Sequence, residues 1–174
     1  MTTLMQAVKN NDVCLVKELI QRGANVDELD TNQDAPLVIA AYEGRTEIVG
    51  LLLQAGADVG AVDPGMKATA LHAAAYAGRT DAARLLIQYK INIDKQGPYN
   101  GYTALHDAIW QNNIGVVRVL LEAGANLKIK SKEGLTPLDL AVSRKRNELV
   151  RLLESHVSEQ SNSPSLRDAV LAGL

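Results

Sequence analysis

Apolar residues recur along most of this chain in pairs of short segments with helical spacing. Within each segment they stand at positions i, i+3 and i+4, which is the spacing of one face of an amphipathic helix. In the N-terminal pair they are Leu4, Ala7 and Val8, and then Leu15, Val16, Leu19 and Ile20. Gly23 follows this pair, and Gly44 lies between the segments of the next pair, where a turn needs a residue without a side chain. The pattern predicts pairs of short helices joined by tight turns, without an extended sheet.

The pairs repeat with a fixed period. One leucine recurs at intervals of 33 or 34 residues, as Leu4, Leu37, Leu71, Leu105 and Leu138. Such a period is typical of a solenoid, in which each repeat buries its apolar face against its neighbours.

Two linked motifs repeat in register with this leucine. The first reads Thr-Ala-Leu-His-Ala-Ala at 69–74, Thr-Ala-Leu-His-Asp-Ala at 103–108 and Thr-Pro-Leu-Asp-Leu-Ala at 136–141, with a weaker copy at 35–40. Each copy resembles the Thr-Pro-Leu-His-x-Ala motif of ankyrin repeats. The second motif, Leu-Leu-x-x-Gly-Ala-Asp/Asn, spans 52–58 and 120–126. The resemblance covers residues 3–154 and implies an all-α ankyrin-repeat solenoid of five helix-turn-helix repeats with β-hairpin-like fingers.

The register of the motifs divides this domain, residues 1–154, into five repeats and leaves a tail. The repeats are expected at about 3–30, 31–63, 64–96, 97–130 and 131–154. Residues 155–165 are rich in serine, which is typical of a linker. Residues 166–174 have helical spacing but are too few for a stable isolated helix. This short helix or tail docks on repeat five, pairs with another chain or stays mobile.

Lys90 interrupts the pattern of the third repeat. It stands at the position that Gly23, Gly56 and Gly124 occupy in other repeats, after the second apolar segment. If the backbone there has a positive φ, a lysine costs about 1 kcal/mol or more. The middle repeat is therefore expected to be the least stable.

Composition and charge exclude several classes of protein. Cys14 is the single cysteine, so no disulfide can form within the chain, and a reducing, cytoplasmic setting is expected. The net charge of −2 argues against a dedicated nucleic-acid binder. No apolar run approaches the length of a membrane span, and the N-terminus lacks the pattern of a signal peptide.

The sequence also lacks the usual signatures of catalysis, so no catalytic residue, cofactor or metal is expected. It contains no glycine-rich phosphate loop, no Cys-x-x-Cys and no His-Glu-x-x-His. His72 and His106 share one repeat position, but packed helices lie about 8–10 Å apart. Ligands of one metal ion must lie closer together than that. The resemblance implies instead that these histidines bond neighbouring backbone and tie repeats together. A metal-dependent enzyme is the alternative.

The aromatic residues also follow the repeat. Tyr42, Tyr76 and Trp110 are each separated by 34 residues, and the resemblance places this position on the concave face. Tyr99 and Tyr102 lie in the fourth finger, and Met66 is the matching residue of the third. Tyrosine and tryptophan are enriched in binding hot spots. These six residues are therefore predicted to form a protein-binding groove; the alternative is that the rings pack between repeats.

Charge changes sign between the two ends of the row of fingers. Acidic residues, Asp34 among them, lie between repeats one and two, and Lys128, Lys130 and Lys132 lie between repeats four and five. Asp34, Lys130 and Lys132 are thus added to the predicted groove, although solvation of finger tips would explain them equally well. The whole pattern predicts a monomeric, non-catalytic module that binds a protein or peptide, and neither nucleic acid nor a membrane. The alternative is a structural module that self-assembles through its tail.

Overall fold

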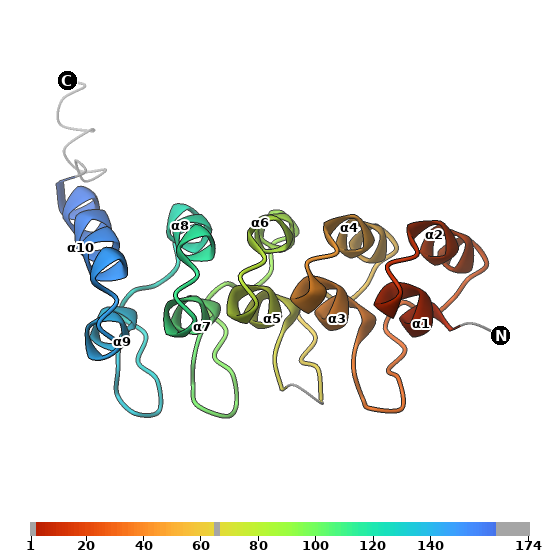
Figure 1. The fold of residues 1–174 in the computed structure, drawn as a ribbon, viewed down its shortest axis with the longest axis horizontal. Helices are drawn as coiled ribbons and strands as arrows, with labels where there is room; N and C mark the ends of the chain where they lie inside the picture. Colours follow the sequence, from red (N-terminus) through yellow and green to blue (C-terminus); the bar gives the residue numbers. More distant parts are fainter. Residues whose placement is uncertain (1–2, 65–66, 163–174) are drawn as a thin grey trace, which may run out of the picture.

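The computed structural model describes residues 3–64 and 67–162, and within these ranges the chain forms ten helices and no extended strand. The helices form five successive pairs along one row (Figure 1). Their bounds are α1 Leu4–Lys9, α2 Val13–Gln21, α3 Pro36–Glu43, α4 Thr46–Gln54, α5 Ala70–Tyr76, α6 Thr80–Gln88, α7 Ala104–Trp110, α8 Ile114–Glu122, α9 Pro137–Ser143 and α10 Asn147–Asn162. The predicted all-helical solenoid is confirmed. In the described ranges no helix combines the length and the apolar character that crossing a membrane requires.

The helices form two layers, with the fingers on one side. The first helices of the pairs (α1, α3, α5, α7 and α9) pack on one another, as do the second helices α2, α4, α6, α8 and α10. The loops between pairs extend beyond the first helices as fingers (Figure 1). One register position in the first-helix layer is always a fully buried alanine, at Ala7, Ala40, Ala74, Ala108 and Ala141. These small side chains let neighbouring first helices approach closely.

Local sequence explains where the first helices begin. The Thr3 side chain accepts a hydrogen bond from the Gln6 backbone at 3.2 Å, and Thr136 does the same for Asp139. Such N-caps satisfy amides that have no partner inside the helix. In α3 and α9 a proline occupies the first turn, where a missing N–H costs nothing.

Positive φ angles follow the second helices α2, α4, α6 and α8, as the Gly23 register position predicts. Lys90 has φ 60°, in the same left-handed region as Gly56 at 90° and Gly124 at 83°. The backbone conformation that this position requires is therefore kept even where the residue is a lysine. The expected strain at Lys90 follows directly from this geometry.

A series of side chains from the turns between helices links each repeat to the one before it. Arg79 Nε donates to the Tyr42 carbonyl at 2.9 Å, and Asn113 Nδ2 donates to the Tyr76 carbonyl at 3.0 Å. Arg45 bonds the Val8 carbonyl in the same way, and Arg146 Nη2 bonds that of Trp110 at 3.3 Å. The last turns of α1, α3, α5 and α7 are thereby held by the next repeat.

The C-terminal helix is longer than the serine-rich composition suggested. Helix α10 continues to Asn162, so the interpretation of residues 155–162 as a linker is wrong. The hydroxyls of Ser155 and Ser158 donate to carbonyls of the preceding turn, at 2.9 Å each, and so do not interrupt the helix. Residues 163–165 and the predicted short helix at 166–174 lie outside the described residues.

Candidate functional site

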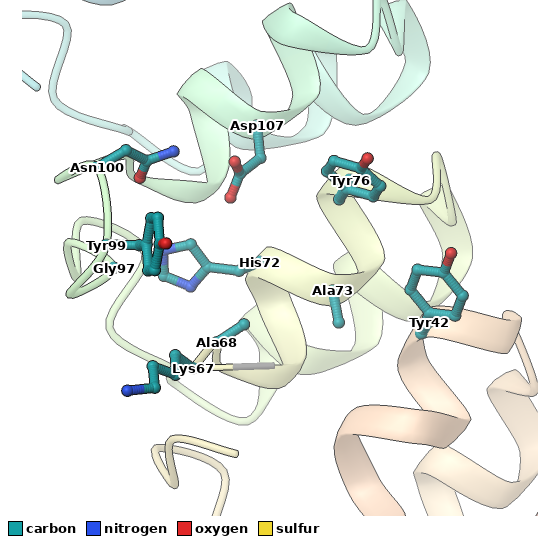
Figure 2. Close-up of a pocket in the computed structure, with 10 residues that line it drawn as sticks. All are labelled: Tyr42, Lys67, Ala68, His72, Ala73, Tyr76, Gly97, Tyr99, Asn100 and Asp107. Atoms are coloured by element: carbon teal, nitrogen blue, oxygen red, sulfur yellow. The ribbon is translucent and has the colours of Figure 1, made fainter. Parts of the chain in front are cut away.

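A pocket of about 280 Å³ opens where the ends of two first helices face two fingers. Three tyrosines surround it, and its lining includes the polar side chains of His72, Asn100 and Asp107 (Figure 2). We call this the tyrosine pocket, defined by Tyr42, Tyr76, Tyr99 and Asp107. Repeats two, three and four all contribute to it, so it exists only when the repeats are stacked.

The end of each first helix positions one ring. Tyr42 is the penultimate residue of α3, and Tyr76 is the last residue of α5. Their carbonyls are the ones that Arg79 and Asn113 hold, so the backbone beneath both rings is fixed from the following repeat. The Tyr42 ring is half-buried, whereas Tyr76 is 47% exposed. Both rings therefore present apolar surface to the pocket while their backbone is immobilised.

The third ring comes from the finger before α7. Tyr99 is 85% exposed and lies near the tip of this finger. Gly97 N donates to the Tyr102 carbonyl at 2.7 Å and closes the base of the finger, and Lys132 N of the next finger bonds the Asn100 carbonyl at 2.9 Å. Gly101 has φ 70°, and a Cβ there would lie 3.0 Å from Lys132 N. The finger is thus closed at its base and held by the next finger, and these contacts support the segment that carries Tyr99.

Asp107 contributes the carboxyl group of this pocket. Its side chain extends from α7 into the space between Tyr99 and Tyr76 (Figure 2). Among the described residues, the carboxylate of Asp107 forms no ion pair and has no hydrogen-bond donor. Burial raises the pKa of Asp107 to about 7, because the charged form loses water without gaining a partner. At neutral pH this carboxyl group is therefore poised between its two protonation states.

The sequence interpretation did not single out Asp107. The signal that could have found it is a comparison by register, since Ala73 stands at the same position in the preceding repeat and Leu140 in the following one. Asp107 thus stands at a position that repeats two, three and five fill with an apolar residue, and it breaks the pattern of these inner and C-terminal repeats. Such a local inconsistency is characteristic of functional sites.

The two histidines serve as ties between repeats, as the resemblance implied. His72 Nδ1 lies 2.8 Å from the Thr69 hydroxyl, and Nε2 lies 3.1 Å from the Tyr102 carbonyl in the next finger. A carbonyl only accepts, so Nε2 carries the proton and Nδ1 accepts from the hydroxyl. His106 repeats this arrangement with Thr103 at 2.9 Å and the Leu135 carbonyl at 3.2 Å. Burial lowers the pKa of both rings and keeps them neutral.

Two of the predicted groove aromatics, Tyr102 and Trp110, do not line the tyrosine pocket. Tyr102 is 5% exposed and stacks on His106 with ring centroids 5.3 Å apart, so the prediction that its ring lines the groove is wrong. Trp110 does not line the tyrosine pocket: the Arg144 guanidinium lies 3.0 Å from its ring centroid, and Tyr102 packs at 6.0 Å. The Trp110 ring thus joins repeats four and five, in line with the alternative interpretation, whereas the Tyr102 ring packs on His106 and Trp110 within repeat four. Met66 lies outside the described residues.

The predicted charged residues are engaged with other parts of the fingers. Lys9 Nζ lies 3.8 Å from Asp34 and 2.6 Å from Asp30, away from the pocket. Lys132 Nζ donates to the Pro98 carbonyl at 2.6 Å and links two fingers. The side chain of Lys130 is exposed, and its carbonyl accepts a hydrogen bond from Gln96. None of the three predicted charges lines the tyrosine pocket.

Among the described residues, no group of three or more histidine, cysteine, aspartate or glutamate side chains is placed to hold a metal ion. The site consists of aromatic surface and one carboxyl group. That composition suits recognition of another molecule by contact and charge.

Comparisons with known proteins agree with this architecture. A family model described as ankyrin repeats (3 copies) matches residues 1–63 and 55–131. The chain is also similar to a probable E3 ubiquitin-protein ligase, XBOS31, of Oryza sativa subsp. japonica, with 37% identity over 71 residues. That match covers 41% of this chain, which spans 16% of the length of the rice protein.

Proposed function

Because this chain belongs to the ankyrin repeat family, whose members are in general protein–protein interaction modules, we propose that it binds a segment of a partner protein at the tyrosine pocket. The module itself is non-catalytic. The partner segment crosses the ends of the first helices and the neighbouring fingers. The tyrosine pocket is the centre of that surface.

The observation that supports this proposal is the convergence of three tyrosines from three repeats on one hollow. Tyr76 and Tyr99 have large apolar rings that are 47% and 85% exposed. Exposed rings contribute little to the stability of the repeats, whereas tyrosines buried by a partner are among the residues that contribute most to binding. The held backbone below Tyr42 and Tyr76 limits the entropy that ordering the site would cost.

A comparison of two tyrosine variants tests the proposal. Peptides are selected from a random display library on the full chain, and their Kd values are measured for wild type, Tyr76→Ala and Tyr89→Ala. Tyr89 is 38% exposed but follows α6 in the other helix layer, so it is a matched control. Tyr76→Ala is expected to weaken binding at least tenfold, or about 1.4 kcal/mol. Equal binding by all three proteins would contradict the proposal.

A second candidate is self-assembly through the C-terminal end. Val142 and Val157 are 57% and 45% exposed near this end, and exposed apolar side chains can mark a contact surface. Light scattering on the full chain and on a chain ending at Glu154, which lacks Val157 and all later residues, distinguishes the candidates. Only assembly through the tail gives an oligomer that the shortened chain loses.

The similarity to the rice protein does not extend the activity in its name to this chain. The matched segment is 71 residues long, and the chain spans 16% of the rice protein. The ligase activity belongs to the name of that whole protein, and the proposal made here is limited to recognition.

A further inference from the structure

We propose that the tyrosine pocket recognises a basic side chain, lysine or arginine, of the partner segment, and that Asp107 is the residue that pairs with it. This inference rests on the proposed function and specifies its chemistry.

The lining of the pocket is complementary to a cation with an apolar stem. Tyrosine rings favour a positive charge over their faces, by about 0.5–1 kcal/mol at exposed sites and more where water is excluded. They also cover the methylene groups of a lysine or arginine. Tyr76 and Tyr99 flank Asp107 on two sides, and Tyr42 lies farther along the same hollow (Figure 2). A basic side chain entering between the rings would place its charge at the carboxylate.

Within residues 3–64 and 67–162, no cation pairs with this carboxylate. Lys67 lines the pocket, but its ammonium group points away from Asp107 (Figure 2). Arg144 lies over the Trp110 ring instead. Partial burial without a partner destabilises the charged form of this carboxyl group. A cation that binds beside it would offset that cost. The site therefore gains more from a cation than an exposed aspartate would.

The same carboxylate disfavours the competing ligands. An acidic side chain would meet Asp107 with like charge, and an apolar one would leave the carboxylate buried and unpaired. Either outcome lowers affinity relative to a basic residue. Specificity would thus come from one side chain at the end of a pocket whose other walls are tolerant.

Binding of a cation should be linked to proton release. A paired Asp107 is ionised, so binding near neutral pH should release roughly half a proton per complex, and affinity should increase between about pH 6 and pH 8. Burial keeps His72 and His106 neutral and raises the pKa of the Tyr102 phenol, so these groups do not mimic this change. The other titratable groups near Asp107 are Lys67, Tyr76 and Tyr99, which line the pocket, and Arg144 after α9. The charged residues of α8, Arg118 and Glu122, are exposed in the second layer.

A double-mutant cycle on the selected peptides tests the inference. Each basic residue of a peptide is replaced by methionine, and Kd is measured for wild type and for Asp107→Asn. Asp81→Asn is the control for loss of charge alone, because Asp81 is an exposed acid at the start of α6. For one basic residue of the peptide, replacement by methionine is expected to raise the Kd at least tenfold for wild type and for Asp81→Asn. For Asp107→Asn the same replacement should raise the Kd less than threefold.

The outcomes separate this inference from the function on which it rests. Peptides that require Tyr76 but show no coupling between any basic residue and Asp107 would overturn the basic-residue inference and leave the binding function supported. Failure to select any peptide whose binding requires Tyr76 would count against both. Calorimetry in two buffers of different ionisation enthalpy adds an independent check: wild type is expected to release protons that Asp107→Asn does not release, and proton uptake at Asp107 on binding would contradict the ion pair.

Discussion

Replacing Asp107 with asparagine should stabilise the protein, and by an amount that depends on pH. Asparagine keeps the shape of the side chain and removes its charge. Burial raises the pKa of Asp107 from 3.8 to about 7 in the folded protein, whereas the unfolded chain keeps a value near 4. Between these values the folded state binds more protons than the unfolded state. The stability of the wild type therefore falls as pH rises through this window, and the variant lacks that loss.

The size of the effect follows from the two pKa values. A difference of about three units corresponds to an upper limit of about 4 kcal/mol at 1.36 kcal/mol per unit. Two effects reduce this upper limit. Asp107 lies in the first turn of α7, where the helix dipole stabilises negative charge by about 0.3–1 kcal/mol, and the surroundings of a half-buried group can relax around its charge. We expect Asp107→Asn to raise the unfolding free energy by about 1–4 kcal/mol above pH 7, relative to its effect near pH 4.

Urea unfolding at about pH 4.5 and pH 8, followed by circular dichroism, measures the difference between the two proteins. Titration of His72, His106 and Asp34 is common to both proteins and cancels in the difference. Asp81→Asn is the control and should show no comparable dependence on pH. A difference between wild type and Asp107→Asn that is the same at both pH values would refute the reasoning, because Asp107 would then ionise without cost.

Three further predictions concern the repeats themselves. Lys90→Gly should raise the unfolding free energy by about 1 kcal/mol because φ is 60° there. Arg84→Gly, at an exposed position inside α6, should lower it by about 1 kcal/mol, and denaturant midpoints that move in the same direction would contradict this. Trp110→Ala should lower the unfolding free energy by about 1–2 kcal/mol through loss of its contacts with Arg144 and Tyr102. The Kd for a selected peptide should change less than threefold, and a tenfold loss of binding would show that Trp110 contacts the peptide. Asn113→Ala removes hydrogen bonds to two carbonyls of α5 and should lower the unfolding free energy by about 1–3 kcal/mol. Urea unfolding measures this change, and an unchanged unfolding free energy would show that these bonds are not maintained in solution.

The architecture could be predicted because it depends on local and periodic signals. The recurring leucine places each helix pair, and the register of Gly23, Gly56 and Gly124 correctly indicated a left-handed conformation at Lys90. The role of His72 was also accessible, since its repeat motif carries the tie to the next finger. These features repeat, so one copy helps to interpret the others.

Features that depend on neighbouring side chains could not be predicted in this way. Register alone predicted that Trp110 lines the groove beside Tyr76, but Arg144 of repeat five packs on one face of the ring, which stays 37% exposed. The serine-rich composition after Glu154 suggested a linker, although serine hydroxyls can bond within a helix. The pocket itself arises from residues of three repeats, and Asp107 became visible only where their side chains converge.

The most direct test of the central claim is to map a selected peptide onto the protein by NMR. Amide chemical shifts of the full chain are compared with and without saturating peptide. If the tyrosine pocket is the binding site, the largest changes will cluster at Tyr42, Tyr76, Tyr99 and Asp107 and at their chain neighbours. Changes confined to the second helices, or to α10, with the tyrosine pocket unaffected, would contradict it.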